Sequence, residues 1–496
     1  MKRKMLSILI SAFMFMTIFP ATAFASGDTV TDANSLWITS ETINDDIISA
    51  WGEDAATIKA NEDGSYTVKL LKNISLANSK TVSFGKQFGG DADPLIVLDL
   101  NGKTIEGTSI PVANYANLTI KDSSADKTGG ISYTGNGYFV AINNVGNKMT
   151  IEGGNFSCAG AGSASYNSAI STAGGVKTVI NGGNFTCDSA GAVKTYGETV
   201  INGGNFEGKY GVVAQVNSEG KVGSITFPED STAIINADQI AFVSSGNADS
   251  AGIIDVKGGT FISSKVLGTI GDGVDKSSVL NVTGGIHSAD PGEFVPDSAS
   301  FAKFTSSDGT EVWVLGKDKI KETAKNADEG DTIVILSGDI DLSELDNGIT
   351  VKNEGLGDVV VNGSKVDSGS EILTHAHKLV TKGAKKATCT SEGYTGDKVC
   401  KICNQTIKKG KVIAKKAHDY KNGKCIVCGT ADPNYNSTGN SSNENNLTSN
   451  GTNITKPNSP DTSDNNNVII WSLLAVCSIV AMGITIIYCK KRRYIK

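Results

Sequence analysis

The sequence predicts an all-β protein whose main body is a parallel β-solenoid. A six-residue phrase, apolar-x-Gly-Gly-x-Phe, carries this prediction: it occurs at residues 151–156, 180–185 and 201–206, with looser copies at 256–261 and 282–287. Short strands that turn at a Gly-Gly corner and recur roughly every 20 to 30 residues are typical of stacked coils. The 57 Gly and 9 Pro among 496 residues, with 39% hydrophobic residues, exclude collagen and wholesale disorder.

The repeated phrase also predicts how each coil packs. Side chains alternate along a strand, so the aliphatic residues of successive copies should stack inward as columns. Phe156, Phe185 and Phe206 should form an aromatic column in the same way. The Gly pair supplies positive φ at the corner, and the Asn after it tolerates such geometry and can hydrogen-bond in a stacked row.

The N-terminal 25 residues, 1–25, are expected to be a secretion signal. A basic start precedes an apolar stretch over residues 5–19, and Ala23 and Ala25 form a small-x-small cleavage site. An uncleaved anchor or a buried helix is the alternative. Residues 26–88 are then expected to be a lead-in that caps the open strand edges of the first coil.

Residues 89–316 are expected to form the coils, beginning with a strand-turn-strand pattern at 95–105. This pattern contains the phrase Asp-Leu-Asn-Gly-Lys-Thr-Ile, which resembles the opening coil of bacterial pectate-lyase-like surface proteins. The resemblance implies a right-handed parallel β-helix. Proteins of this kind include lyases, glycosidases and inert adhesins, so the fold alone assigns no activity. Residues 317–373 are expected to close the stack, with a helix over 319–327 and strands at 331–336 and 358–361.

Residues 374–435 are expected to form a small separate module rich in Cys and His. Two Cys-x2-Cys pairs stand 21 residues apart, and such paired knuckles favour a tetrahedral zinc ion. His375 lies nearby as well. The candidate metal ligands are His377, Cys389, Cys400, Cys403, His418, Cys425 and Cys428.

The module resembles a zinc-ribbon-like repeat of surface proteins from anaerobic Gram-positive bacteria. The matching phrases are Thr388-Cys389-Thr390, His418-Asp419-Tyr420 and Gly423-Lys424-Cys425, together with the two Cys pairs. Disulfides are the competing interpretation, because they suit exported proteins. Seven Cys outside the C-terminal apolar run are an odd number, so complete pairing is excluded. Structural zinc, a disulfide-containing module and free thiols all stay open.

Cys158 and Cys187 follow the repeated phrase at the same offset. In adjacent coils they would stack at a distance that a disulfide can span. A disulfide and a buried cysteine ladder are both compatible with this spacing.

The C-terminal end is expected to anchor the protein. Residues 436–467 form a stalk of mostly Asn, Ser, Thr and Gly, which cannot bury a core. The apolar run 468–489 is long enough to span a membrane, and the basic tail 490–496 should be cytoplasmic.

A short motif before the span, Ser459-Pro460-Asp461-Thr462-Ser463, is similar to the sorting signals of Gram-positive cell-wall proteins. The resemblance implies that sortase cleaves after Thr462 and joins it to peptidoglycan. That family has Gly after the Thr, whereas this chain has Ser463. Wall attachment and a retained membrane anchor therefore both stay open.

The net charge and the positions of the Arg and acidic residues limit the classes of ligand and reaction that the coils can support. The net charge is −7, so the composition gives no sign of the basic surface that nucleic-acid binding requires. The only Arg residues are Arg3, Arg492 and Arg493, so the coils are poorly equipped to clamp a polyuronate or a nucleotide. Acids are scattered through the coils, whereas a glycosidase needs two carboxylates across the scissile bond.

We therefore expect a non-catalytic, adhesin-like protein of the cell surface that binds an extracellular glycan or protein. A carbohydrate-active enzyme, meaning a polysaccharide lyase or glycosidase, is one alternative. A structural spacer of the cell envelope is the other. The expected partners are peptidoglycan through sortase, the membrane through the C-terminal helix and an unidentified extracellular ligand, with no nucleic acid.

Overall fold

The computed structural model describes residues 29–38, 43–85, 95–137, 139–159, 167–343, 345–375, 378–402, 404 and 406–435. They fall into two compact units. The first contains the described residues up to 385 together with 394–412, and the second contains 386–393 and 413–435.

Several sequence predictions lie outside the described residues. These are the signal segment 1–25, everything from residue 436 onward including the sorting motif and the apolar run 468–489, and the two candidate ligands His377 and Cys403. In the part of the chain that is described, no helix combines the length and the apolar character needed to cross a membrane.

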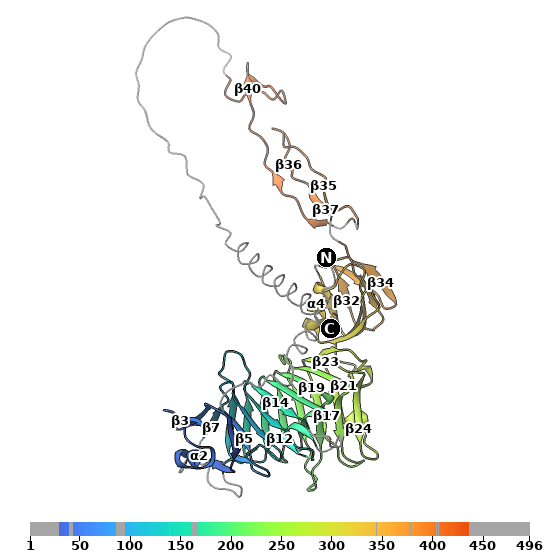
Figure 1. The fold of residues 1–496 in the computed structure, drawn as a ribbon. Helices are drawn as coiled ribbons and strands as arrows, with labels where there is room; N and C mark the ends of the chain where they lie inside the picture. The colour runs from blue at the N-terminus through green and yellow to red at the C-terminus, as the bar shows by residue number, and fades with distance from the viewer. Residues whose placement is uncertain are drawn as a thin grey trace, which may run out of the picture. The chain divides into compact units, whose positions relative to one another are not determined.

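Within the first unit, the described residues from 29 to 287 form three columns of strands, each visited once per turn of the chain (Figure 1). The first column is parallel except where its first two strands pair antiparallel. Its strands are β3 (Ala56–Ala60), β4 (Tyr66–Leu70), β7 (Ile96–Asp99), β10 (Asn117–Lys121), β13 (Lys148–Ile151), β16 (Lys177–Ile180), β18 (Glu198–Ile201), β20 (Ser224–Phe227), β22 (Ile253–Val256) and β25 (Leu280–Val282).

The second column is parallel throughout. Its strands are β1 (Thr29–Ala33), β5 (Asn73–Leu76), β8 (Thr104–Gly107), β11 (Gly130–Tyr133), β14 (Asn155–Cys158), β17 (Asn184–Thr195), β19 (Asn205–Gln215), β21 (Ile234–Ser245), β23 (Thr260–Ile262) and β26 (Gly285–His287).

The third column is also parallel, and the long strands β17, β19 and β21 run on into it after an irregularity. Its other strands are β2 (Leu36–Ile38), β6 (Val82–Phe84), β9 (Val112–Asn114), β12 (Val140–Asn144), β15 (Ser168–Thr172) and β24 (Lys265–Ile270). Three parallel columns in sequence order are compatible with the predicted solenoid.

The aromatic column predicted from the repeated phrase is present in the core. The rings of Phe156 and Phe185 stack at 5.0 Å between centroids, and those of Phe185 and Phe206 at 4.7 Å. The same register continues through Ile235 to Phe261. All five side chains are buried, so each of these coils contributes a ring or, at Ile235, an aliphatic side chain to a core that no single coil could close.

The Gly-Gly corner has the predicted backbone. The second glycine of each pair has positive φ, with values of 128° at Gly154, 110° at Gly183 and 108° at Gly204. The Asn that follows forms a row of side-chain hydrogen bonds, because Asn184 donates to Asn155 and Asn205 to Asn184, both at 2.8 Å.

A second row of hydrogen bonds runs just before the glycines. Asn181 donates to Glu152 at 2.9 Å, and Asn202 donates to Asn181 at 2.7 Å. Glu152, at the first position of this row, is exposed. The two rows leave one face of the corner lined with amides.

The coils begin earlier and end earlier than the sequence suggested. Parallel pairing starts at β1, so strands within 26–88 already belong to the stack, which the weak pattern of that segment did not reveal. Helix α2 (Ile43–Trp51) packs there with Ile47 and Trp51 buried, as a cap would. The parallel columns end at β26, because β28 pairs with β26 antiparallel.

The closing region has a core of its own, and its predicted helix and strands are present. A mixed sheet contains β27 (Phe301–Thr305), β28 (Glu311–Leu315), β29 (Thr332–Ser337), β31 (Thr350–Asn353) and β34 (Ser370–Leu373). A smaller sheet contains β30 (Ile340–Leu342), β32 (Val359–Val361) and β33 (Ser364–Val366). The predicted helix is α4 (Lys317–Asn326), and short helical turns α3 (Lys276–Val279) and η1 (Gly292–Phe294) precede the closing region.

Candidate metal centre and surface groove

Four of the seven predicted ligands come together in the second unit. The donor atoms of Cys389, His418, Cys425 and Cys428 all lie within 4.8 Å of one another. The sulfur atoms of Cys389 and Cys425 are 3.8 Å apart, and Cys428 Sγ is 3.3 Å from His418 Nδ1. This Cys3His group could hold a metal ion.

A tight hairpin positions the second Cys pair. Strands β40 (Tyr420–Lys421) and β41 (Lys424–Cys425) pair antiparallel, and Asn422 and Gly423 between them both have positive φ. Asn-Gly is the preferred pair for such a turn. Cys425 ends β41, and the chain then turns so that Gly429 N–H donates to the Cys425 carbonyl at 2.8 Å.

The Thr-Cys-Thr phrase positions the remaining thiol. Thr388 Oγ1 accepts the backbone N–H of Ser391 at 2.9 Å, which folds the segment around Cys389. Lys416 N–H donates to the Thr388 carbonyl at 3.0 Å, so the segment is tied to the stretch of chain just before His418. The His418 ring stacks on Tyr420 at 5.4 Å, which fixes its orientation.

The thiols of the group differ in acidity. Desolvation opposes ionisation of Cys425, but N–H groups of Cys428 and Val427 and the His418 side chain outweigh it and lower its pKa to about 5. Hydrogen bonds from Thr430 lower the pKa of Cys428 as well. Its hydrogen bond to Cys428 raises the pKa of Cys389 to about 11. Cys389 therefore keeps its proton beside the two more acidic thiols, Cys425 and Cys428. A cation bound between the sulfur atoms would favour loss of that proton as well, because it would offset the repulsion between neighbouring thiolates.

The other candidate ligands are not part of this group. Cys400 is buried in the first unit and lies 3.3 Å from His375 Nε2. His377 and Cys403 are outside the described residues. Sequence spacing therefore identified the right residue types, but it did not show that Cys400 and the Cys425–Cys428 pair belong to different units.

Cys158 and Cys187 lie at equivalent positions of adjacent strands, as their shared offset predicted. Both are buried, and the Cys187 thiol is a free cysteine. A hydrogen bond with Cys158 and burial raise the pKa of Cys187. Whether the two thiols oxidise to a disulfide stays a prediction.

A groove of about 1440 Å³ lies where the corner face of the last coils meets the start of α4. Sequence reasoning missed it, because α4 follows the coils by many residues and no spacing links the two. The groove is lined by Asn205, Glu229, Asp230, Ser231, Thr232, Ile234, Lys257, Gly258, Gly259, Thr260, Thr283, Gly285, Leu315, Gly316, Lys317, Asp318, Lys319 and Glu322.

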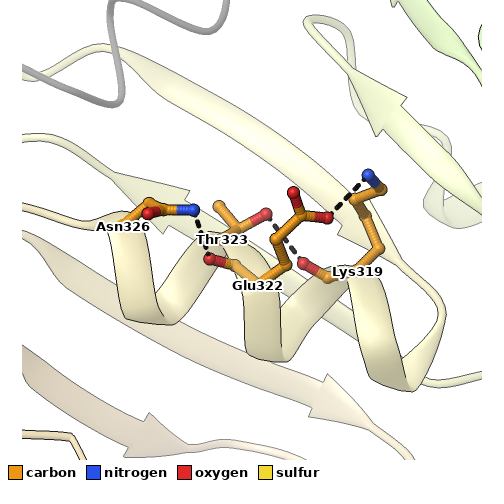
Figure 2. Close-up of polar contacts among 4 residues, drawn as sticks. All are labelled: Lys319, Glu322, Thr323 and Asn326. Atoms are coloured by element: carbon orange, nitrogen blue, oxygen red, sulfur yellow. Dashed lines mark hydrogen bonds and ion pairs between the residues drawn. The ribbon is translucent and has the colours of Figure 1, made fainter. Parts of the chain in front are cut away.

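The charges in the groove are nearly balanced and partly paired. Three lysines stand against four acids in its lining. Lys319 forms an ion pair with Glu322 at 2.9 Å (Figure 2), and Lys257 forms one with Asp255 at 2.8 Å. Figure 2 also shows Thr323 donating to the Lys319 carbonyl, at 2.8 Å, which fixes this helical edge. The lining also contains the hydroxyl groups of Ser231, Thr232, Thr260 and Thr283. Three of them donate to backbone carbonyls, Ser231 to Ile201, Thr232 to Asn202 and Thr283 to Val256, so their oxygen atoms face the groove mainly as acceptors.

No family model matches this chain, and no curated protein or solved structure matches it either. The basis for inferring its function is therefore the fold, the Cys3His group and the groove.

Proposed function

We propose that this chain is a surface protein that binds a neutral glycan in the groove without cleaving it. The observation that carries the proposal is the lining of the groove: four hydroxyl groups, the Asn205 amide and nearly balanced charges in a space of about 1440 Å³. Sugars are recognised by many weak hydrogen bonds, and orientation in binding sites comes from a few well-placed polar groups.

The charge of the lining favours a neutral ligand over an acidic one. Three lysines and four acids leave a net charge of −1, and two of these lysines are held in ion pairs. No Arg lines the groove to grip a carboxylate with two hydrogen bonds. Of the four lining acids, Glu322 is held in an ion pair with Lys319. A glycosidase requires two carboxylates across the scissile bond, so Asp318 with Glu229 or Asp230 is the pair on which the enzyme alternative would depend.

We infer that the coils form a right-handed parallel β-helix displayed outside a Gram-positive cell. The support is in the sequence: the signal segment 1–25, the span 468–489 and the motif around Thr462. In this proposal sortase joins Thr462 to peptidoglycan, and the stalk 436–467 holds the binding face away from the wall.

We also infer that the Cys3His group binds zinc in a structural role. A tetrahedral zinc ion with Zn–S bonds of about 2.3 Å sets its sulfur atoms about 3.8 Å apart. The Cys389 and Cys425 sulfurs are separated by 3.8 Å. Four protein ligands leave no open position for a substrate, so the ion would stabilise the second unit rather than catalyse a reaction.

The binding proposal is tested by titrating the full-length chain, kept soluble in detergent, against an array of neutral and acidic glycans. Thr260→Arg places a bulky cation in the groove and should abolish saturable binding. Asn155→Arg is the matched control, because it changes the same corner position several coils away and should leave binding intact.

Three other outcomes would redirect the assignment. Release of new reducing ends or unsaturated products from a bound glycan would favour the enzyme alternative. Absence of any saturable binding by the folded protein would favour the spacer alternative. Binding that Thr260→Arg leaves unchanged would place the ligand elsewhere.

Wall attachment is tested separately in Gram-positive cells that express sortase. The intact chain should appear in the fraction that muramidase releases from the wall, and Thr462→Ala should move it to the membrane fraction. If both forms stay in the membrane fraction, the chain is retained by its apolar span.

A further inference from the structure

We propose that a small three-stranded sheet of the first unit binds a linear phosphate polymer through its lysines. The sheet consists of β35 (Leu379–Lys382), β37 (Asp397–Cys400) and β38 (Thr406–Lys408). Neither the groove nor the Cys3His group contributes a residue to it. The inference therefore goes beyond glycan binding and does not rest on it.

The two segments that build this sheet carry a large positive charge. Residues 378–385 and 394–412 contain eight lysines and a single acid, whereas the whole chain has a net charge of −7. The lysines are all exposed, and they are Lys378, Lys382, Lys385, Lys398, Lys401, Lys408, Lys409 and Lys411. Charge of one sign that is concentrated on one small element attracts a partner of the opposite sign.

The single acid neutralises little of this charge, because it is already bonded within the segment. Asp397 Oδ1 accepts the Tyr394 hydroxyl and, at 2.8 Å, the Gly410 N–H. Across the part of the chain that the structure describes, ion pairs involve lysines of the coils and of the closing region, and none involves a lysine of this sheet. The positive charge of the sheet thus remains available to a ligand.

Two pairs of lysines lie opposite each other on neighbouring strands. Lys398 in β37 is the register partner of Lys408 in β38. On the other side of β37, Lys401 N–H donates to the Lys378 carbonyl at 2.8 Å, so these two residues are neighbours as well. Like charges directly opposite each other destabilise a sheet. An anion bound at these pairs would offset that repulsion, so ligand binding would stabilise the sheet.

Hydrogen bonds hold two of the lysines in place and leave them able to bind an anion. Lys398 Nζ donates to Thr381 Oγ1 at 2.8 Å, on the strand away from Lys408. Lys382 Nζ donates to Asn404 Oδ1 at 3.2 Å. Because an ammonium group has three donors, each of these lysines can make a further hydrogen bond to a ligand.

The residue types favour phosphate over carboxylate in the ligand. Planar carboxylates are gripped best by the two-pronged side chain of Arg, whereas Lys binds phosphate as a point charge. The three Arg residues of the chain all lie outside these two segments. Several point charges on one sheet therefore fit a polymer whose phosphates repeat along its length.

The same segments offer little to a nucleic acid base. Single-stranded nucleic acids are held by aromatic side chains on which successive bases stack. Tyr394 is the one aromatic residue of the two segments, and its hydroxyl is bonded to Asp397. The chemistry of the sheet therefore favours a phosphate polymer that carries no bases.

The test is the binding of fluorescently labelled inorganic polyphosphate to the full-length chain in a non-ionic detergent, followed by anisotropy at several salt concentrations. The affinity should fall as the salt concentration rises, because each lysine that binds a phosphate releases a counterion. Lys398→Gln combined with Lys408→Gln should weaken binding several-fold at low salt. The slope of log affinity against log salt concentration should become shallower by about 1 to 2.

The matched control is Lys177→Gln combined with Lys352→Gln, which removes the same charge from two exposed lysines that form ion pairs elsewhere in the chain. It should leave the affinity and the slope close to those of the unaltered chain. Equal losses in the two double variants would show that only the net charge matters, which overturns the proposal. Absence of polyphosphate binding at low salt overturns it as well.

Two competitors test the class of the ligand. Unlabelled polyphosphate should displace the probe at a lower concentration than either poly-L-glutamate or a single-stranded oligonucleotide. Equal or stronger competition by poly-L-glutamate overturns the preference for phosphate. Equal or stronger competition by the oligonucleotide makes the sheet a nucleic-acid site and overturns the assignment to a polymer without bases.

Discussion

His287 stands where the repeated phrase has phenylalanine, and it ends the aromatic column. Its ring is fully buried and stacks on Phe261 at 4.8 Å. Nε2 lies 3.1 Å from the Gly284 carbonyl, while Nδ1 has no hydrogen-bond partner. Burial lowers the pKa of His287 to about 4, because the charged ring cannot be hydrated in the core.

This burial predicts that the coils lose stability in mild acid. The folded-state pKa lies below the ordinary value of 6.5, so between pH 6.5 and pH 4 the unfolded chain binds a proton at His287 that the folded chain does not. The free energy of unfolding therefore falls as the pH is lowered through this range. Between pH 7 and pH 5 this residue should account for a loss of about 2 kcal/mol. His287→Phe should remove that part of the loss in urea unfolding measured at the two pH values.

Phe261→Leu is the matched control, because it shortens the same column without touching a titratable group. It should lower the unfolding midpoint by a similar amount at both pH values. If the His287→Phe chain keeps the full pH dependence of the unaltered chain, the titration of His287 is not its source.

Phe185 tests the aromatic column at its centre, where rings pack on both sides. Phe185→Ala leaves a cavity between two fixed coils and should cost about 3 to 5 kcal/mol in the free energy of unfolding. Phe185→Leu keeps most of the volume and should cost clearly less. Equal losses in the two variants, measured by urea unfolding, would mean that the coils collapse around the cavity.

At the scale of the element, the Gly-Gly corner decides the shape of each coil. Gly183 has a φ of 110°, and an added Cβ would lie 3.0 Å from the Gly154 carbonyl oxygen. Gly153, the first glycine of the neighbouring pair, has open space around its Cβ position and no positive φ. The two glycines of the repeated phrase thus differ in backbone conformation and in the space available for a Cβ atom.

Alanine at these two positions should therefore have different effects. Gly183→Ala should destabilise the coils by about 1 to 2 kcal/mol, because a side chain strains the left-handed backbone. Gly153→Ala should change the stability by no more than about 0.5 kcal/mol, as an unconstrained surface substitution does. Thermal unfolding of both variants, followed by circular dichroism, makes the comparison. A loss as large in Gly153→Ala would show that both glycines are required.

The coils that contain the repeated phrase could be predicted from the sequence, whereas the pairing of the coils that lack it could not. The phrase at 151–156 and its copies predicted the strands, the corner and the stacked rings, because identical local chemistry recurs once per coil. The first coils, from β1 to β6, lack the phrase, so their parallel pairing to later strands was not visible. Long-range register in such coils is set by packing rather than by a local motif.

At the scale of the whole molecule, the sites were harder to predict than the fold. Spacing indicated Cys and His ligands for a metal, but only the three-dimensional structure joins Cys389 to His418, Cys425 and Cys428. The groove had no sequence signal, because Thr232, Thr260 and Lys319 approach one another only through coil stacking and the return of α4. Metal ligands at a fixed spacing can be recognised in the sequence, whereas a groove formed by segments that are distant in the sequence cannot.

The division into two units predicts that loss of the Cys3His metal unfolds only part of the chain. Residues 386–393 and 413–435 contain no large apolar core, so metal binding should supply most of their folding free energy. The coils have a continuous core of their own and need no metal. In Cys425→Ser, limited proteolysis followed by mass spectrometry should therefore find new cleavage sites within those two segments. The same variant should keep the unfolding midpoint of the coils, and new cleavage between residues 95 and 287 would contradict the independence of the two units.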